Sequence, residues 1–101
     1  MQLRWTDRAR RDLLAIGRYI ARDNLSTARR WVERLRERAR QAAATPLAGR
    51  VVPELQRDDI REVFLRNYRI VYRVRENAID VLTVFEGHRL FKAENLPELD
   101  D

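Results

Sequence analysis

Residues 61–85 read REVFLRNYRIVYRVRENAIDVLTVF, and this stretch decides how the chain folds. Apolar and polar side chains alternate in three runs within it, which is the pattern of half-buried strands. Asn67 and the pair Glu76-Asn77 lie between the runs and are typical turn residues. We therefore predict three consecutive antiparallel strands, over residues 61–66, 68–75 and 79–85.

The predicted middle strand places three arginines on one face. Because successive side chains of a strand point to opposite faces, the two sets are Tyr68, Ile70, Tyr72 and Val74 on one face and Arg69, Val71, Arg73 and Arg75 on the other. Like charges on one face repel each other, so this face suits an anion. The alternative is a solvated face on which Glu62, Glu76 and Asp80 neutralise the arginines.

The first half of the chain has the period of amphipathic helices. Apolar residues recur every three or four positions, at Ala9, Leu13, Ile16 and Ile20 and then at Ala28, Val32, Leu35, Ala39 and Ala42. Thr6-Asp7 is predicted to start the first helix and Ser26 to cap the second, which Pro46 ends. Two such helices joined by a tight loop form a helical hairpin. Trp5 and Trp31 are expected to anchor the core.

Short strands are also predicted at residues 2–5, at a sheet edge, and around Val51-Val52. The helices are separated from the strands, which predicts an α+β fold. In this fold an N-terminal strand and a helical hairpin pack on an antiparallel β-sheet meander. The length of 101 residues fits one domain. We assign residues 1–92 to this domain and residues 93–101 to an acidic C-terminal tail.

The composition excludes several classes of function. The chain has no cysteine and a single histidine, His88. This excludes disulfides, thiol nucleophiles and histidine or cysteine metal clusters, and we expect no metal and no cofactor. No run approaches the ~18 apolar residues of a membrane span, and the charged N-terminus is unlike a signal peptide. We therefore expect a cytoplasmic protein with no membrane partner.

Positive charge is concentrated in the first half. Residues 1–50 contain 13 arginines and five acidic residues, a net charge of +8, in a chain whose net charge is +5. Such asymmetry indicates an anionic partner, either a nucleic acid or an acidic protein segment. One stripe of the first helix is predicted to contact that partner through Arg8, Arg11, Arg18 and Arg22. On the second helix, ion pairs with Glu33 and Glu37 are expected for Arg29, Arg36 and Arg40.

His88 and Arg89 directly follow the last predicted strand, where site residues are common. A histidine can transfer protons near neutral pH, and an arginine can bind a phosphate or an oxyanion. The alternative is an ordinary polar surface turn.

Over nearly its whole length the chain resembles the RelE/ParE superfamily of type II toxin–antitoxin toxins. The resemblance begins at the first helix with Trp5-Thr6, Ala9 and Asp12-Leu13. It continues with Arg61-Glu62 and the run NYRIVYRV at residues 67–74, and closes with residues 79–85 leading into Gly87-His88-Arg89. The run at residues 67–74, after a strand with Arg-Glu, is the most specific part.

The resemblance implies a small basic bacterial toxin that is held inactive by a cognate antitoxin with an acidic, extended C-terminal segment. Toxin and antitoxin would form a hetero-oligomer. RelE-like members cut mRNA in the ribosomal A site without a metal, whereas ParE-like members inhibit DNA gyrase by binding. Arg73 and Arg89 match positions that are commonly basic in both branches. His88 lies near the place where some nucleases carry a terminal histidine, but the region of Phe91 lacks their catalytic tyrosine. Lys92 is the single lysine, unlike the lysine-rich nuclease faces, so we favour the ParE-like branch.

Metal-independent RNA cleavage would need a base, a stabilised phosphorane and an acid. The catalytic candidates are Arg69, Arg73 and Arg89 for charge and His88 for proton transfer, and a second proton-transfer group is not evident. A gyrase inhibitor is therefore our first interpretation and a ribosome-dependent nuclease the alternative, so whether the chain is an enzyme depends on the branch. A non-catalytic nucleic-acid-binding domain is the third interpretation. The predicted antitoxin-binding residues are Arg8, Arg11, Arg18, Arg22, Arg69, Arg73 and Arg75.

Overall fold

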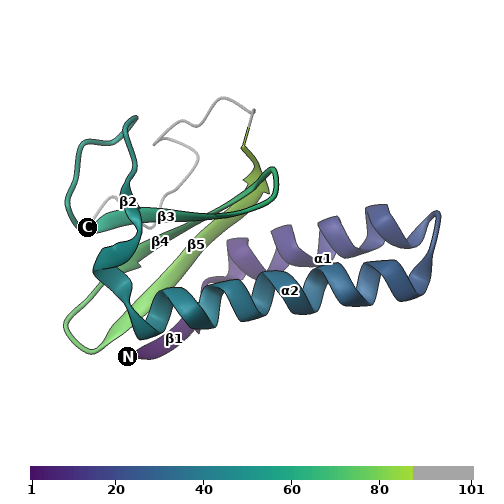
Figure 1. Ribbon diagram of the computed structural model, residues 1–101, viewed down its shortest axis with the longest axis horizontal. Helices are drawn as coiled ribbons and strands as arrows, with labels where there is room; N and C mark the ends of the chain where they lie inside the picture. Colours follow the sequence, from purple (N-terminus) through teal and green to yellow (C-terminus); the bar gives the residue numbers. More distant parts are fainter. Residues whose placement is uncertain (88–101) are drawn as a thin grey trace.

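One five-stranded sheet and two long helices make up residues 1–87, the part of the chain that the computed structural model describes (Figure 1). The elements are β1 (Gln2–Trp5), α1 (Asp7–Ala21), α2 (Leu25–Ala44), the 3-10 helix η1 (Pro46–Ala48), β2 (Arg50–Val51), β3 (Ile60–Leu65), β4 (Tyr68–Val74) and β5 (Ala78–Glu86). The strand order is β1-β5-β4-β3-β2. Strand β1 pairs in parallel with β5, and the other neighbours are antiparallel. The predicted α+β fold is confirmed, and β1 and β2 extend the meander at its two edges.

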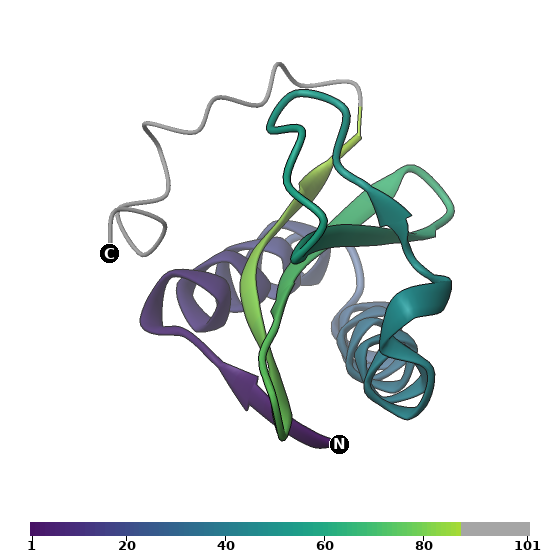
Figure 2. The same ribbon diagram turned by 90° about the vertical axis from the view of Figure 1, so that its left-hand side faces the viewer.

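The helical hairpin covers one face of the sheet (Figure 2). The main core lies between them and contains Ala9, Leu13, Leu35, Ala39, Ala42, Ala43, Val63, Ile70, Tyr72, Ile79, Val81 and Val84. Trp5 packs against this core, as predicted. Removal of these apolar side chains from water is the main driving force for this packing.

Helix α1 is tied to β5 at its start. The Thr6 side chain caps the helix by accepting from the Ala9 amide at 3.1 Å, and its hydroxyl donates to the Val81 carbonyl at 2.8 Å. Further along the helix, the Asp12 carboxylate accepts from the Val84 amide at 3.2 Å and from the Thr83 hydroxyl. These bonds fix the angle at which α1 crosses the sheet, and they confirm the helix start predicted at Thr6.

Helix α2 begins earlier than the sequence predicted. The cap is Asn24, whose side-chain oxygen accepts from the Thr27 amide at 2.9 Å, and Ser26 already lies inside the helix. The prediction of Ser26 as the cap is therefore wrong. Asn and Ser are equally good caps, so residue type alone does not decide between positions 24 and 26. The helix ends at Ala44, before Pro46, as predicted.

The opposite face of the sheet carries a second, smaller core. Side chains of Val52, Ile60, Val71 and Leu82 are fully buried there, and Leu55 and Phe85 pack against them. The alternation predicted for β4 is confirmed, because Val71 belongs to this core while its neighbours Ile70 and Tyr72 belong to the main one. Residues 52–59, between β2 and β3, supply Val52 and Leu55 and so cover a face that the sequence analysis left open.

Gly49 allows a buried tyrosine to reach the chain after α2. The Tyr72 hydroxyl donates to the Pro46 carbonyl at 2.6 Å. A Cβ at position 49 would lie 2.1 Å from that hydroxyl oxygen, so a larger residue would displace the bond.

Candidate functional site

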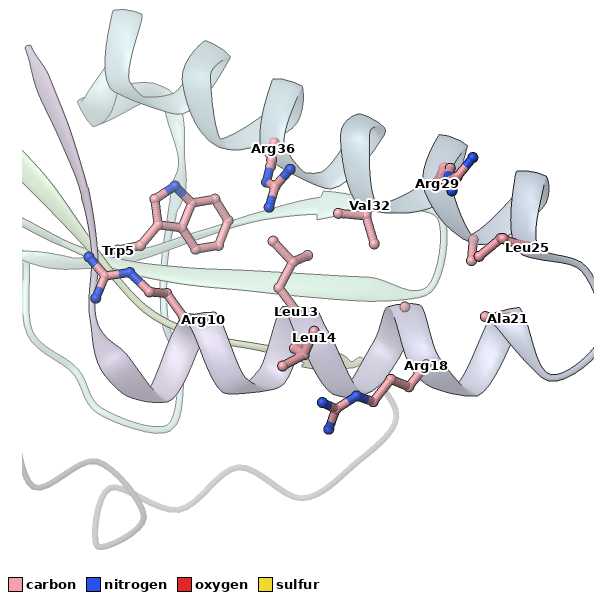
Figure 3. A pocket seen from close by; sticks show the side chains of 12 residues that line it. Trp5, Arg10, Leu13, Leu14, Arg18, Ala21, Leu25, Arg29, Val32 and Arg36 are labelled. Carbon is pink, nitrogen blue, oxygen red and sulfur yellow. The ribbon is translucent and has the colours of Figure 1, made fainter.

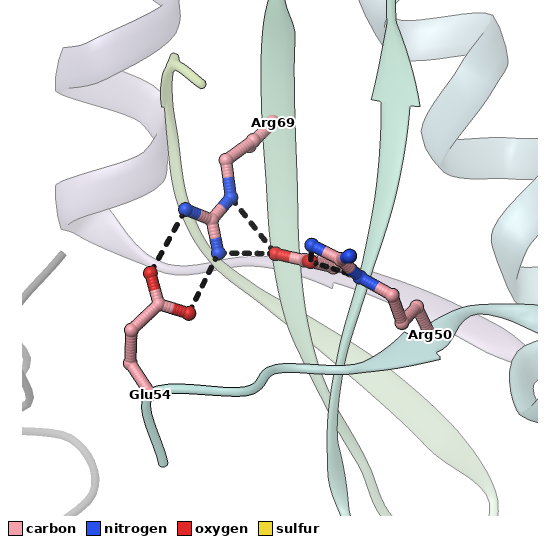
Figure 4. Close-up of polar contacts among 4 residues, drawn as sticks. Arg50, Glu54 and Arg69 are labelled. Carbon is pink, nitrogen blue, oxygen red and sulfur yellow. Dashed lines mark hydrogen bonds and ion pairs between the residues drawn. The ribbon is translucent and has the colours of Figure 1, made fainter. Parts of the chain in front are cut away.

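Arg69, the first arginine of the predicted anion-binding face, is buried in a network of charges (Figure 4). Its side chain donates to Glu62 at 2.8 Å and to the two Glu54 oxygens at 3.1 and 3.2 Å. Arg50 donates to the other Glu62 oxygen at 2.7 Å. Arg69 is 5% exposed and Glu62 is 1% exposed, and charges so buried must be paired.

The network also binds the loop of residues 52–59 to the sheet. Glu54 belongs to this loop, and the hydrogen bonds from Arg69 lower the pKa of the Glu54 carboxyl below its ordinary value. The Arg69 guanidinium carbon also lies 5.2 Å from the centre of the Phe85 ring, a cation–π distance. Arg69 thus joins β4, β5 and the loop.

Arg73 and Arg75 are paired as well. The Arg73 Nε lies 3.4 Å from the Asp59 carboxylate, and Arg75 is paired with Asp80. Asp80 also accepts from Arg4 at 2.8 Å. Burial raises the pKa of Asp80, but the hydrogen bonds from the two arginines outweigh it and the pKa is lowered.

The strand face therefore does not present the open cluster of guanidinium groups that the sequence suggested. Arg69, Arg73 and Arg75 each have a carboxylate partner. The alternative interpretation named two of the partners, Glu62 and Asp80. The other two come from the loop of residues 52–59, whose position over the sheet cannot be read from strand periodicity.

The four arginines of the stripe predicted on the first helix lie in different environments. Arg8 pairs with Asp12, one helical turn away, at 3.3 Å. Arg11 and Arg22 are exposed, and within residues 1–87 neither forms an ion pair. Arg18 borders a groove between the two helices. The four arginines therefore do not form one site.

An apolar groove, which we call the interhelical groove, runs between α1 and α2 (Figure 3). Its volume of about 680 Å³ is within the ~300–1,000 Å³ of ligand-binding clefts. The apolar part of the lining is Trp5, Leu13, Leu14, Gly17, Ala21, Leu25, Ala28 and Val32, and the charged part is Arg10, Arg18, Arg29 and Arg36. Leu14 is 53% exposed and Leu25 is 56% exposed. Half-exposed leucines beside arginines in a groove of this size make it a candidate binding site.

The groove exists because small residues line the seam between the helices. A Cβ at Gly17 would lie 3.0 Å from a Val32 methyl carbon, so the helices are in close contact at this position. Ala21 and Ala28 add little volume beyond it. The larger Leu14 and Leu25 side chains therefore line a depression instead of meeting each other.

Three of the four groove arginines have uncompensated charges. Arg10 pairs with Asp7 at 3.0 Å. In the described part of the chain, no ion pair is formed by Arg18, Arg29 or Arg36. The groove thus combines an apolar floor with positive charge that no carboxylate of residues 1–87 neutralises.

The predicted ion pairs of Arg29 and Arg36 are wrong. Both glutamates pair with Arg40 instead, Glu33 at 3.2 Å and Glu37 at 3.0 Å. Arg40 follows Glu37 at the i,i+3 spacing and also reaches Glu33, seven residues earlier, so both carboxylates are bound by one arginine.

Sequence reasoning missed most of the groove. It placed Arg18 on a basic stripe but assigned no binding role to Arg10, Arg29 or Arg36. The available signal was Leu14 and Leu25, two leucines outside the apolar stripes of their helices. His88, Arg89 and the proposed boundary at residue 92 lie outside the described residues.

Across residues 1–87, no group of three or more His, Cys, Asp or Glu side chains could hold a metal ion. Over the same residues, neither helix is long and apolar enough to cross a membrane.

Comparison with known proteins identifies the family. Residues 3–91 match the family model of the ParE toxin of the type II toxin–antitoxin system parDE. A solved structure of the chromosomal ParDE toxin–antitoxin system from P. aeruginosa has the same fold, with a TM-score of 0.71 and 24% sequence identity. That match covers 85% of this chain and 95% of the other. No curated protein matches the chain significantly. The predicted resemblance is confirmed, and the chain belongs to the ParE toxin family of type II toxin–antitoxin systems.

Proposed function

We propose that this toxin is neutralised by an antitoxin whose acidic, amphipathic C-terminal segment occupies the interhelical groove, and that it acts by binding DNA gyrase. One observation supports this antitoxin site. The groove is lined both by the exposed Leu14 and Leu25 and by three arginines that lack carboxylate partners within residues 1–87. A segment with alternating apolar and acidic side chains satisfies both features.

Each component of the groove contributes in a different way. Leu14 and Leu25 are each about half exposed, so burying the rest of each side chain contributes roughly half of the ~1.5–3 kcal/mol of a full leucine burial. Arginines bind carboxylates through two parallel hydrogen bonds, which fixes the register of the segment. Apolar contacts and arginines therefore both contribute to the affinity, and the arginines select an acidic segment.

This proposal revises the predicted antitoxin-binding residues. Arg18 stays in the site, and Arg29 and Arg36 join it. Arg11 on α1 and Arg22 directly after it are exposed, and they remain proposed contacts for a segment that extends beyond the groove. An antitoxin carboxylate at Arg8, Arg69, Arg73 or Arg75 would have to displace a carboxylate of this chain, so these four are not included.

The charge pairs on the strand face also support a toxin that acts by binding. A nuclease would need Arg69 and Arg73 to face the scissile phosphate, but their charges are directed at Glu54, Glu62 and Asp59. Gyrase inhibition needs no proton transfer and no free cation on that face. This is why we prefer gyrase to the ribosome as the target.

A supercoiling assay tests the proposal. Purified chain added to gyrase should abolish supercoiling at micromolar excess, and the antitoxin, sought in the adjacent reading frame, should restore it. Toxin carrying Arg29→Glu and Arg36→Glu should still inhibit gyrase but should no longer be relieved by the antitoxin.

Two results would contradict it. Supercoiling that is unaffected by the chain would remove gyrase as the target. Cleavage of translated mRNA at the ribosomal A site, detected by primer extension and lost in Arg73→Ala, would establish the nuclease alternative.

A further inference from the structure

A row of arginines lies on the side of α2 that faces away from the interhelical groove. With 3.6 residues per turn, Arg30, Arg34 and Arg38 fall about half a turn from the groove residues Arg29, Val32 and Arg36. The whole strip of this side reads Thr27, Arg30, Arg34, Arg38, Gln41 and Thr45, with neither an acidic nor an aliphatic residue. Arg61 of β3 lies beside the chain that follows α2, through its contacts with Leu47 and Gly49. We call these four residues, Arg30, Arg34, Arg38 and Arg61, the arginine ridge.

Neutral groups hold each ridge side chain in place. Arg30 donates to the Thr27 hydroxyl at 3.2 Å, and the Arg34 guanidinium lies 5.7 Å from the centre of the Trp31 ring. Arg38 donates to the Phe64 carbonyl at 3.0 Å.

Arg61 is held in the same way, by backbone carbonyls. It donates to Asp58 at 3.0 Å, Leu47 at 3.1 Å and Gly49 at 3.0 Å. Within residues 1–87, none of the four ridge arginines forms an ion pair with a carboxylate. The ridge side chains are therefore positioned while their charges stay uncompensated, in contrast to Arg40, which two glutamates neutralise.

We propose that the arginine ridge binds the phosphodiester backbone of a nucleic acid. At a rise of 1.5 Å per residue, Arg30 and Arg38 are about 12 Å apart along the helix. Each strand of a duplex presents one phosphate per ~3.4 Å of axis, so this distance spans three to four phosphates.

An acidic polypeptide fits the ridge less well than a phosphate backbone does. The groove offers exposed leucines as well as charge, whereas the helical strip of the ridge offers charged and polar side chains without aliphatic ones. Regularly spaced cations without an apolar floor match a ligand whose contacts are almost entirely ionic.

The ridge inference does not depend on the proposed antitoxin site or on gyrase as the target. The groove and the ridge lie on opposite sides of α2. A segment that fills the groove therefore leaves the ridge accessible.

The test measures binding of the purified chain to a labelled 20-base-pair duplex DNA of random sequence by fluorescence anisotropy over a series of salt concentrations. Arg34→Glu with Arg38→Glu should weaken binding at least tenfold, and the slope of log K against log salt should fall by about two, since two phosphate contacts are lost. The matched control is Arg29→Glu with Arg36→Glu, which makes the same change of charge on the groove side of the same helix. It should change binding less than threefold.

Two further variants distinguish a loss of binding caused by the changed charge from one caused by misfolding. Arg34→Lys with Arg38→Lys keeps the charge and should retain most of the binding, and Arg34→Gln with Arg38→Gln should lose it without adding negative charge. Equal losses in the ridge and groove variants would overturn the proposal, because the binding would then follow net charge rather than a site.

The class of ligand is decided by parallel titrations. A duplex RNA of the same length distinguishes RNA from DNA as the source of the backbone, and either one upholds the proposal. Polyglutamate that binds as tightly as the duplexes, and loses binding in the ridge variant, would assign the ridge to an acidic protein surface and overturn it.

Discussion

Arginine has two different roles in this molecule, one in the sheet and the other in the helical hairpin. Arg69 on β4 is 5% exposed and bound by two carboxylates. Arg18, Arg29 and Arg36 along the groove are exposed, and none of them forms an ion pair with the rest of residues 1–87. A buried cation must be neutralised within the fold, but an exposed one is stable in water and available to a partner. Environment rather than residue type therefore separates the structural arginines from the candidate binding ones.

The loop of residues 52–59 causes much of this difference. It brings Glu54 and Asp59 onto the outer face of the sheet, where they pair with Arg69 and Arg73. The same loop buries Val52 and covers Val71. The strand face that was predicted to bind an anion therefore carries a second hydrophobic core.

Removal of the Arg69 side chain should have the largest effect on stability. Arg69→Ala leaves Glu62 buried with Arg50 as its remaining partner, and breaking a buried pair costs about 3–5 kcal/mol. We expect a loss of about 3 kcal/mol in the free energy of unfolding, measured by urea denaturation.

Arg29→Ala is the matched control on the exposed side. A surface substitution of this kind stays within about 0.5 kcal/mol. The contrast between sheet and hairpin would fail if the two variants were equally stable.

The groove variant should have the second largest effect, on binding rather than stability. Arg29→Glu with Arg36→Glu replaces two attractive contacts by repulsion, and we expect the dissociation constant of the toxin–antitoxin complex to rise about 100-fold, or ~2.7 kcal/mol. Isothermal titration calorimetry measures this change. Arg34→Glu with Arg38→Glu, on the other side of α2, serves as the control, and an equal loss there would show that the antitoxin covers the whole helix.

The sequence predicted the elements better than the surfaces. The alternation in β4 and the Thr6 cap are local patterns, and both are confirmed. The cap of α2 was misplaced by two residues because Asn24 and Ser26 are equivalent by type. The groove was missed because it results from the close approach of two helices at Gly17. The apolar period of each helix taken alone does not show how closely the two helices approach.

The same limit explains the arginines. Whether Arg69 binds an external anion depends on Glu54, fifteen residues earlier, and on how the intervening chain folds over the sheet. Whether Arg36 is neutralised depends on the choice of Glu33 and Glu37 between several arginines on one helix. Spacing alone defines the candidates for a pair but not the pair that forms.

Acid should weaken the sheet network by a smaller amount. The pKa of Glu54 is lower in the folded chain than in the unfolded one, because Arg69 donates to its carboxylate. The unfolded chain therefore takes up the proton first as the pH falls, so this contribution is complete above about pH 4.3, the ordinary pKa of Glu, and is lost below it.

The Glu54→Gln variant isolates that contribution. The loop glutamate is partly exposed, and water screens the pair, so we expect a contribution below about 1 kcal/mol. Urea denaturation from pH 7 to pH 3 should show a shallower decline for the variant than for the natural chain. Parallel declines would mean that Glu54 does not bind Arg69 in solution.

The smallest effect should separate two arginines one turn apart on α2. Arg40→Ala removes exposed ion pairs to Glu33 and Glu37, so its loss in the free energy of unfolding should be small. Arg36→Ala removes no ion pair, so its free energy of unfolding should stay closer to that of the natural chain. Thermal melts at low and high salt measure the difference, which should disappear at high salt because salt screens exposed charges. A salt-sensitive loss in Arg36→Ala as large as that in Arg40→Ala would mean that Arg36 already has a carboxylate partner within its own chain, and the groove would then have one cation fewer to offer an antitoxin.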